Sequence, residues 1–273
     1  MQVKRIQPHP LLQGYIEKMW VFESSGKPLN EDMKLIVPNG LIKLVVPFKN
    51  GLSGKMHGWH HLSKENSITV IGMTDLPSIV ESETDAPAGT IGVEFSPKGA
   101  YRFFHLKHVD IKNRIHPLTD LLGKVATQLE QRIGNTPVVN EKICILQQFL
   151  MELFLKQDND QIFDFCVQRM IQTQGRITVK ELEKQTGYSS RWLNMKFIER
   201  VGVSPKNLAS ILRFHHYYQT IVNDSELIFF QREFYNYFYD QSHFIKEFKR
   251  FTGITPTKFQ HSINDFGKIF YKE

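Results

Sequence analysis

Two segments of this chain, 51 residues apart, follow the same pattern of residue types. The first is SSRWLNMKFIERVGVSPKNL at residues 189–208, and the second is DQSHFIKEFKRFTGITPTKF at residues 240–259. In each segment a polar residue caps an amphipathic helix, a glycine ends that helix, and a Ser-Pro or Thr-Pro pair begins the next one. Such a repeat requires two similar helical units on one scaffold, so it constrains the fold more than any other feature of the sequence.

The residues around this repeat also have helical periodicity. Thr178 and Ser189 are expected to cap helices, and Gly175 and Gly187 to end them. The expected helices cover residues 162–174, 179–186, 190–201 and 205–222. A short helix, a glycine-containing turn and a second helix form the helix-turn-helix pattern. We therefore predict an all-α domain of two helix-turn-helix units joined by a helix.

The N-terminal part has a different pattern. Runs rich in β-branched and aromatic residues occur at 19–22, 34–37, 41–46, 67–71 and 90–95. Turn residues such as Pro38-Asn-Gly40 and Lys49-Asn-Gly51 separate these runs. Short strands at this spacing predict a small barrel or sandwich. Apolar residues then recur with helical spacing from 118 to 129 and from 140 to 156, so helices are expected to flank the strands.

The most polar break in the chain is Gln157-Asp-Asn-Asp160. We place the domain boundary there and expect an α+β protein of two domains. Residues 1–158 form the β-rich, barrel- or sandwich-like domain with flanking helices, and residues 159–262 form the all-α domain. Residues 263–273 form a tail with no evident partner in the sequence.

The formal net charge of +6 is uneven. Residues 1–158 hold 18 Lys and Arg against 16 Asp and Glu, a balance of +2, whereas the shorter remainder holds 16 against 12, a balance of +4. This difference favours a polyanionic partner for the C-terminal part, although an ordinary solvated surface explains it equally well. Cys144 and Cys166 lie in apolar helical surroundings and are expected to be core residues of a cytoplasmic protein. The first residues contain no apolar run that could serve as a signal peptide, and we expect no segment that spans a membrane.

Helical spacing separates inward from outward residues in the two repeated helices. Leu193 and Phe197 face inward in the first, as do Phe244 and Phe248 in the second. The outward residues are Ser190, Arg191, Asn194 and Met195 in the first helix, and Gln241, Ser242, His243 and Lys246 in the second, with Lys249 and Arg250 on the flank. Arg can bond guanine, Asn and Gln can bond adenine, and Lys and Ser can bond phosphate. The first eight are candidate base-contacting residues, and Lys249 and Arg250 are candidate phosphate contacts.

Residues 165–262 resemble the DNA-binding domain of AraC/XylS-type transcriptional regulators. The resemblance is carried by YDQSHFIKEFKRFTGITPTKF (239–259) and by GVSPKNLASILRF (202–214). It implies sequence-specific binding to double-stranded promoter DNA, commonly with activation through RNA polymerase. By position, the base-contacting residues of that family correspond to Arg191, Asn194 and Met195 in the first unit and to Gln241, Ser242 and Lys246 in the second.

The chain departs from the family pattern at several positions. Glu183 stands where a small residue is usual, and Met195 stands where a basic residue is common. In the second unit, Glu233 and Tyr237 replace the usual Ala and Gly of the leading helix and turn. These departures leave an alternative open, in which the second unit no longer binds DNA and the protein is an interaction or sensor module.

The N-terminal part resembles, over the stretches 92–100 and 118–123, the β-rich sensor domain of a subset of these regulators. This implies a small-molecule effector without naming one. A homodimer formed through residues 118–156 is left open. The His57-Gly-Trp-His60-His61 cluster could bind a metal, but no cysteine or carboxylate accompanies it at a familiar spacing, so we expect the surface of a loop or strand. Trp20 and Trp59 could line a ligand cavity or pack in the core. Without a phosphate-binding loop or a nucleophile motif, we predict neither an enzyme nor a cofactor.

Overall fold

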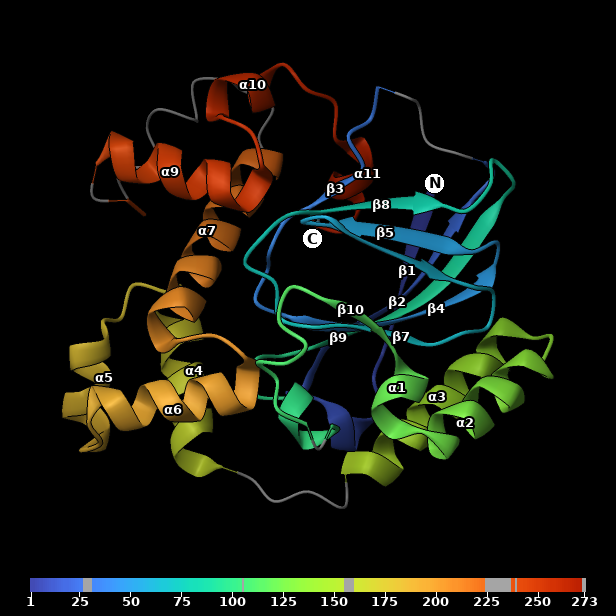
Figure 1. Ribbon diagram of the computed structural model, residues 1–273, viewed down its shortest axis with the longest axis horizontal. Helices are drawn as coiled ribbons and strands as arrows, with labels where there is room; N and C mark the ends of the chain where they lie inside the picture. The colour runs from blue at the N-terminus through green and yellow to red at the C-terminus, as the bar shows by residue number, and fades with distance from the viewer. Residues whose placement is uncertain (27–30, 105, 155–159, 224–236, 239, 272–273) are drawn as a thin grey trace.

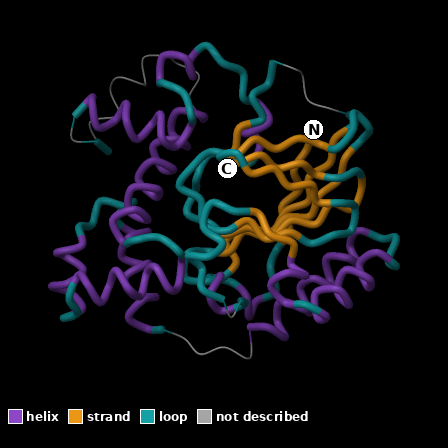
Figure 2. The backbone as a smooth tube through the Cα atoms, in the orientation of Figure 1, coloured by secondary structure: helices purple, strands orange, loops and turns teal. Residues whose placement is uncertain are grey.

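The structure is a computed structural model that describes residues 1–26, 31–104, 106–154, 160–223, 237–238 and 240–271. Its N-terminal part consists of two antiparallel sheets, and its C-terminal part is helical (Figures 1 and 2). This is the predicted α+β architecture with a barrel-like N-terminal domain and an all-α C-terminal domain. The predicted boundary at residue 158 falls between the described ranges.

One sheet has six strands in the order β1-β2-β9-β4-β7-β10, and the other has four in the order β3-β8-β5-β6. The strands of the six-stranded sheet are β1 (Gln2–Ile6), β2 (Ile16–Ser24), β4 (Ile42–Lys49), β7 (Thr69–Ile71), β9 (Ala88–Phe95) and β10 (Ile115–Pro117). Those of the four-stranded sheet are β3 (Leu35–Ile36), β5 (Leu52–Met56), β6 (Trp59–Ser63) and β8 (Ser78–Ser82). Residues from both sheets line one cavity, so the sheets face each other.

Because successive side chains along a strand point to opposite faces, those of the six-stranded sheet lie in two different surroundings. On β2, Met19 and Val21 pack in the main core, whereas Trp20 and Phe22 belong to a separate apolar cluster between the sheets. Gly92 on the neighbouring strand β9 makes room for Trp20, because a Cβ atom there would collide with the indole ring. The sheet thus has one face toward the helices and one toward the cavity.

Three helices cover the outer face of the six-stranded sheet (Figure 1). They are α1 (Leu118–Leu122), α2 (Lys124–Gly134) and α3 (Val139–Phe154). The sequence predicted one apolar face from 118 to 129, but Gly123 interrupts the helix with a φ of 57°. The interruption changes the direction of the face, and Val125 is consequently 51% exposed.

The helical part contains α4 (Gln161–Gln172), α5 (Val179–Thr186), α6 (Ser190–Val201), α7 (Pro205–Asn223), α9 (Gln241–Thr252) and α10 (Pro256–Gln260). The predicted caps are confirmed: Thr178 forms a capping box with Glu181, and the Ser189 side chain accepts a hydrogen bond from the Trp192 N–H. Gly187, Gly202 and Gly253 end their helices in the left-handed conformation.

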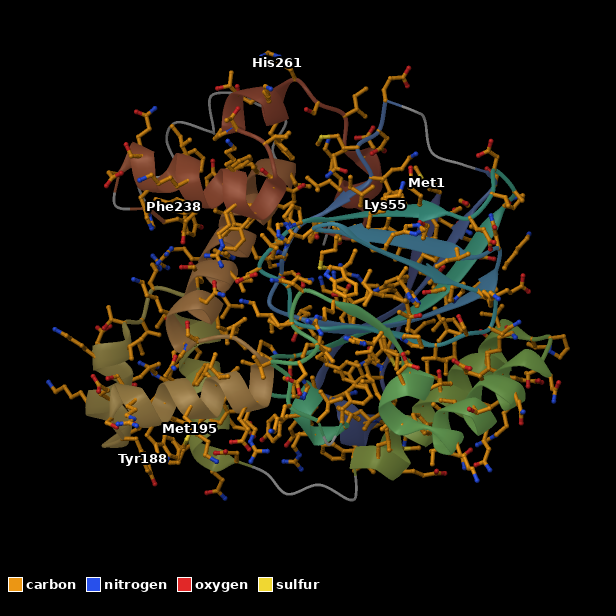
Figure 3. The ribbon with its side chains drawn as sticks, in the orientation of Figure 1. Met1, Lys55, Tyr188, Met195, Phe238 and His261 are labelled. Carbon is orange, nitrogen blue, oxygen red and sulfur yellow. The ribbon has the colours of Figure 1, made fainter. Side chains whose placement is uncertain are left out.

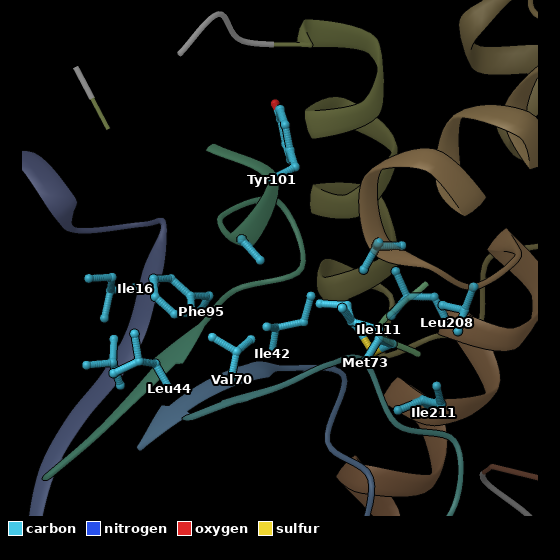
Figure 4. Close-up of a cluster of buried hydrophobic side chains, with 14 of the residues drawn as sticks. Ile16, Ile42, Leu44, Val70, Met73, Phe95, Tyr101, Ile111, Leu208 and Ile211 are labelled. Carbon is cyan, nitrogen blue, oxygen red and sulfur yellow. The ribbon is translucent and has the colours of Figure 1, made fainter. Parts of the chain in front are cut away.

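Helix α7 joins the two parts of the molecule. Its Leu208 and Ile211 are fully buried in the same apolar cluster as Ile42, Met73 and Ile111 of the N-terminal part (Figure 4). The contact continues at Gly40, where an added Cβ atom would lie 3.0 Å from a methyl carbon of Leu212. The helix between the two predicted helix-turn-helix units therefore also makes an apolar contact with the barrel.

The tail has a partner, which the sequence did not indicate. It contains α11 (Asp265–Ile269), which lies beside β3 at the end of the barrel (Figure 1). Phe266 and Tyr271 are buried against the N-terminal part. We define residues 263–271 as the tail segment.

None of the helices in the described ranges is both long and apolar enough to cross a membrane.

Candidate functional site

Helices α6 and α9 are the expected recognition helices of the two predicted helix-turn-helix units. Figure 1 shows these two helices near opposite ends of α7, running in the same general direction. Their N-terminal ends lie away from the sheets and their C-terminal ends lie toward them. In a helix-turn-helix protein, residues near the N-terminus of the recognition helix contact base edges. Both of these ends are therefore available on the side opposite the barrel.

All four candidate residues of the first unit, Ser190, Arg191, Asn194 and Met195, are exposed on α6. Met195 is 55% exposed and, in Figure 3, lies on the outer side of this unit. Helical spacing places them there, because the intervening Leu193 and the later Phe197 are fully buried.

Glu183 occupies the close approach between the two helices of the first unit. One of its carboxylate oxygens accepts a hydrogen bond from the Ser190 N–H. A negative charge at a helix N-terminus is stabilising, because the first backbone N–H groups lack partners within the helix. The departure from a small residue at this position thus has a structural role in fixing the start of α6.

Two aromatic residues of the first unit were missed by sequence reasoning. The rings of Tyr188 and Trp192 stack with centroids 4.0 Å apart, and the Lys196 ammonium lies 5.6 Å from the Trp192 ring. Tyr188 is 39% exposed and lies beside the start of α6 (Figure 3). The sequence signal that could have identified them is their position, with Tyr188 directly before the Ser189 cap and Trp192 three residues after it.

In the second unit, Gln241, Ser242, His243 and Lys246 are likewise exposed on α9. The Asp240 carboxylate accepts a hydrogen bond from the His243 N–H at 2.7 Å and caps the helix. The buried face of α9 consists of Phe244, Glu247, Phe248, Phe251 and Thr252.

Tyr237 lies before α9, at the position where the family usually has glycine. Its ring contacts α7, with centroids 5.6 Å from His216 and 5.9 Å from Tyr217. Aromatic packing therefore accommodates this departure from the family pattern. Glu233, the other departure in this unit, lies outside the described residues.

The two candidate phosphate contacts have different surroundings. Lys249 is exposed. Arg250 is also exposed at the surface, but its Nη2 lies 2.6 Å from the Asp75 carboxylate of the N-terminal part and 2.9 Å from the Asn207 amide oxygen. In this arrangement the Arg250 guanidinium is held within the chain.

Asp75 is the centre of a polar junction between the two domains. Its carboxylate forms an ion pair with the Lys112 ammonium at 2.9 Å and accepts hydrogen bonds from the side-chain amides of Asn113 and Asn207 at 2.6 Å each. It also accepts a hydrogen bond from the Arg250 guanidinium. Burial by itself raises the pKa of this carboxyl, but hydrogen bonds from Lys112, Asn113 and Asn207, with the Lys112 charge, outweigh it and lower the pKa to about 2. Asp75 is therefore ionised at neutral pH and holds α7 and α9 against the barrel.

The second candidate site is the cavity between the sheets, which encloses about 70 Å³. Its walls are mainly apolar and include Trp20, Val45, Leu52 and Val80. Of the two tryptophans proposed as cavity residues, Trp20 lines it, whereas Trp59 is 58% exposed and lies under the Arg114 guanidinium.

Two opposite charges lie in this cavity wall. The Glu94 carboxylate accepts hydrogen bonds from the Trp20 indole N–H at 3.3 Å and from the Asn39 amide at 3.4 Å. Lys43 has no hydrogen-bond partner for its ammonium among the described residues. Burial lowers the pKa of the Lys43 amine, the Glu94 charge opposes this effect, and the Lys18 charge reinforces it.

The histidines proposed as metal ligands lie on and beside the β5–β6 hairpin, where His60 hydrogen-bonds Ser53 at 2.9 Å. Within the described ranges, no group of three or more His, Cys, Asp or Glu side chains is arranged to hold a metal ion.

The paired recognition helices define a class: this is a DNA-binding transcription regulator. Residues 182–262 match the model of a helix-turn-helix domain family, and residues 4–117 match a domain of unknown function, DUF6597. The helix-turn-helix domain is of the AraC type. No curated protein sequence matches the chain.

Several solved structures are similar in outline. An apo variant of ToxT from Vibrio cholerae is 12% identical, with 90% of this chain and 98% of that chain covered and a TM-score of 0.48. ToxT with an unsaturated fatty acid bound is also 12% identical, with 93% and 98% covered and a TM-score of 0.48. The cupin domain of Cnp3 from Schizosaccharomyces pombe is 9% identical, with 35% and 66% covered and a TM-score of 0.27.

Proposed function

We propose that this regulator binds two successive major-groove segments of promoter DNA with α6 and α9. The observation that carries the proposal is that all eight candidate base-contacting residues are exposed on two recognition helices joined by α7. Helix α7 has 19 residues, a length of roughly 28 Å at 1.5 Å per residue. This is close to the ~34 Å of one DNA turn that separates the half-sites of helix-turn-helix dimers.

The chemistry of the side chains suggests their roles. Arg191 is suited to guanine, and Asn194 and Gln241 are suited to adenine, because each can form two hydrogen bonds to its base in the major groove. Met195 can contact the thymine methyl group. Ser190, Ser242, His243 and Lys246 complete the proposed base-contacting set, and Lys249 and Arg250 are proposed to contact phosphate.

The N-terminal domain is proposed to bind a small-molecule effector in the cavity that Trp20, Lys43 and Glu94 line. A concave, largely apolar site with a few polar groups is typical of small-molecule binding. RNA polymerase as a partner, a homodimer and a cytoplasmic location remain predictions.

Selection of binding sites from random duplex DNA tests the proposed roles. Arg191→Ala and Gln241→Ala should each relax base preference by about 1–3 kcal/mol at one position of the site, and the two positions should lie in different halves of it. Lys268→Ala, on α11, is the matched control and should leave the selected sequence unchanged. An unaltered preference in either recognition-helix variant would contradict the assignment.

A salt titration separates this proposal from a module that binds only protein. Each phosphate contact releases counterions, so DNA affinity should fall steeply as salt increases. Lys249→Ala should weaken all sequences alike and reduce the slope of log K against log [salt] by about 1. A chain with no salt-dependent DNA affinity would favour the interaction module.

A further inference from the structure

The tail segment pairs with the β3 region as an additional edge element. The Met33 N–H donates to the Ile263 carbonyl at 2.9 Å, and the Asn264 side chain bonds both the N–H and the carbonyl of Leu35, at 2.9 and 3.1 Å. Farther along, the Tyr271 hydroxyl bonds both the N–H and the carbonyl of Val37, at 3.0 and 2.9 Å. The side chains of Asn264 and Tyr271 thus bond the backbone groups of Leu35 and Val37 that a neighbouring strand would otherwise bond.

Between these two anchors, α11 inserts aromatic side chains into the cavity wall. Phe266 and Phe270 both line the cavity. The Phe270 ring lies 5.1 Å from Trp20 and 6.0 Å from Phe22, and the Phe266 ring lies 5.7 Å from Phe22. The start of α11 is fixed by Asp32, whose carboxylate accepts from the Phe266 N–H at 2.7 Å.

Phe266 belongs to the apolar cluster between the sheets, and Phe270 packs against both that cluster and the main core. The inner wall contributes Trp20, Phe22 and Val45 to that cluster, so the tail supplies the apolar groups that complete it. Removing Phe266 and Phe270 would leave an apolar space for two rings beside Lys43, whose ammonium has no hydrogen-bond partner among the described residues.

The same segment contacts the DNA-binding part through Tyr218 of α7. The Asn264 amide donates to the Tyr218 hydroxyl at 3.3 Å, and the Tyr271 and Tyr218 rings have centroids 5.2 Å apart. The Tyr218 ring also lies 5.8 Å from that of Phe259 of α10. Phe259 in turn packs 5.4 Å from Phe248 of the recognition helix α9. Ring contacts therefore connect Tyr271 of the tail segment with the second unit.

We propose that the tail segment is a tethered ligand of the sensor cavity, and that the effector displaces it. The displacing molecule is of one chemical class: a planar, largely apolar small molecule with an anionic group. Its rings replace those of Phe266 and Phe270, and its anion bonds the Lys43 ammonium. Displacement releases α10 and α9 from the barrel and frees Arg250 from Asp75 to contact DNA. This inference rests on the proposed function, since it specifies the effector class and its route to the DNA-binding domain.

Binding of anilinonaphthalene sulfonate, a fluorescent aromatic anion, tests this proposal on the full chain. In the wild type the probe competes with a segment whose effective concentration is about millimolar or higher, since it is attached to the same chain. Phe266→Ala/Phe270→Ala should therefore bind the probe at least about tenfold more tightly. Lys268→Ala, a surface change in the same helix, should bind it like the wild type. Equal affinity of the wild type and the double variant would overturn the proposal.

Two further variants distinguish the cavity from nonspecific apolar surface. Added to the double variant, Lys43→Gln should weaken probe binding about tenfold and Val80→Phe should abolish it, because one removes the anion partner and the other fills the space. Probe binding that neither change affects would contradict the assigned site. Near-UV circular dichroism reports whether the double variant is folded, and Phe270→Leu, a milder change, should give an intermediate affinity.

The coupling between the tail segment and DNA binding is measured with duplex DNA that the wild type selects. The double variant should bind this DNA at least about threefold more tightly than the wild type or Lys268→Ala, because a tail segment without its two rings is held less firmly in the cavity and releases the second unit more often. Unchanged or weaker binding would overturn the coupling. If the wild type selects no DNA, the proposed function fails, while the probe experiments still decide whether the tail occupies the cavity.

Discussion

At the residue scale, helical periodicity identified the outward side chains correctly but not the partners of the flanking ones. Leu193 and Phe244 face inward because burial on a helix repeats every three or four residues. Arg250 had the same outward position in the pattern, yet its carboxylate partner, Asp75, is 175 residues away in the sequence. A contact of that separation depends on how the domains pack, and local patterns contain no information about it.

Asp75 provides a test at this scale through its pH dependence. Its pKa is about 2 in the folded chain, below the ordinary value, so its stabilising effect is complete above about pH 4 and is lost as the pH falls through about 2. After allowance for screening by solvent, we expect this contribution to be about 1–2 kcal/mol.

Asp75→Asn should lower the free energy of unfolding by about that amount at pH 7. The difference from the wild type should shrink between pH 4 and pH 2, as measured by urea unfolding at each pH. Asp265→Asn, at an exposed ion pair with Lys268, is the control and should have little effect. A difference that stays constant down to pH 2 would show that the carboxylate charge is not what stabilises the junction.

At the scale of elements, capping residues and glycines predicted the helices of the C-terminal part well. These signals are local, because a cap bonds backbone groups three residues away. The tail segment is the opposite case. Helix α11 has only five residues, and its stability depends on Asp32 and on the cavity wall. A helix this short is not stable by itself, so the sequence pattern could not predict it.

Two helix-ending glycines of equal conformation provide a comparison. Gly187 has a φ of 77° and open space around the position of an added Cβ atom. Gly202 has a φ of 81°, but a Cβ atom there would lie 2.5 Å from the His108 carbonyl oxygen of the N-terminal part. Both positions carry the cost of a left-handed residue, and only Gly202 adds a collision between domains.

Gly187→Ala should therefore destabilise the protein by about 1–2 kcal/mol. Gly202→Ala should cost clearly more, about 3 kcal/mol or above, because strain and a backbone collision act together. Thermal unfolding of both variants under one condition gives the comparison. Equal losses would mean that the contact between Gly202 and His108 is not tight in solution.

At the scale of the whole molecule, the apolar core continues from the barrel into the helical part. Leu208 and Ile211 of α7 lie in the same cluster as the outer face of the six-stranded sheet. The sequence indicated two domains with a polar break between them, and it gave no sign that the joining helix packs on the barrel. The apolar residues of α7 are equally consistent with contacts inside the helical domain, since periodicity identifies a buried face but not what covers it.

A shared core predicts cooperative unfolding. The wild type should unfold in one calorimetric transition, because separating the domains would expose the interface around Ile211. Ile211→Ala should cost about 2–5 kcal/mol, the usual range for such a truncation in a core. Ile221→Ala, at a partly buried position of the same helix, should cost less. Two separate transitions in the wild type would show that the domains are energetically independent.

The tail segment covers the edge of β3, and this affects the solubility of the protein. β3 is the outermost strand of the four-stranded sheet, and without residues 263–271 its free N–H and carbonyl groups would be open to another copy of the chain. Exposed strand edges promote edge-to-edge aggregation. A chain shortened by these residues should scatter light at concentrations where the intact protein remains dispersed.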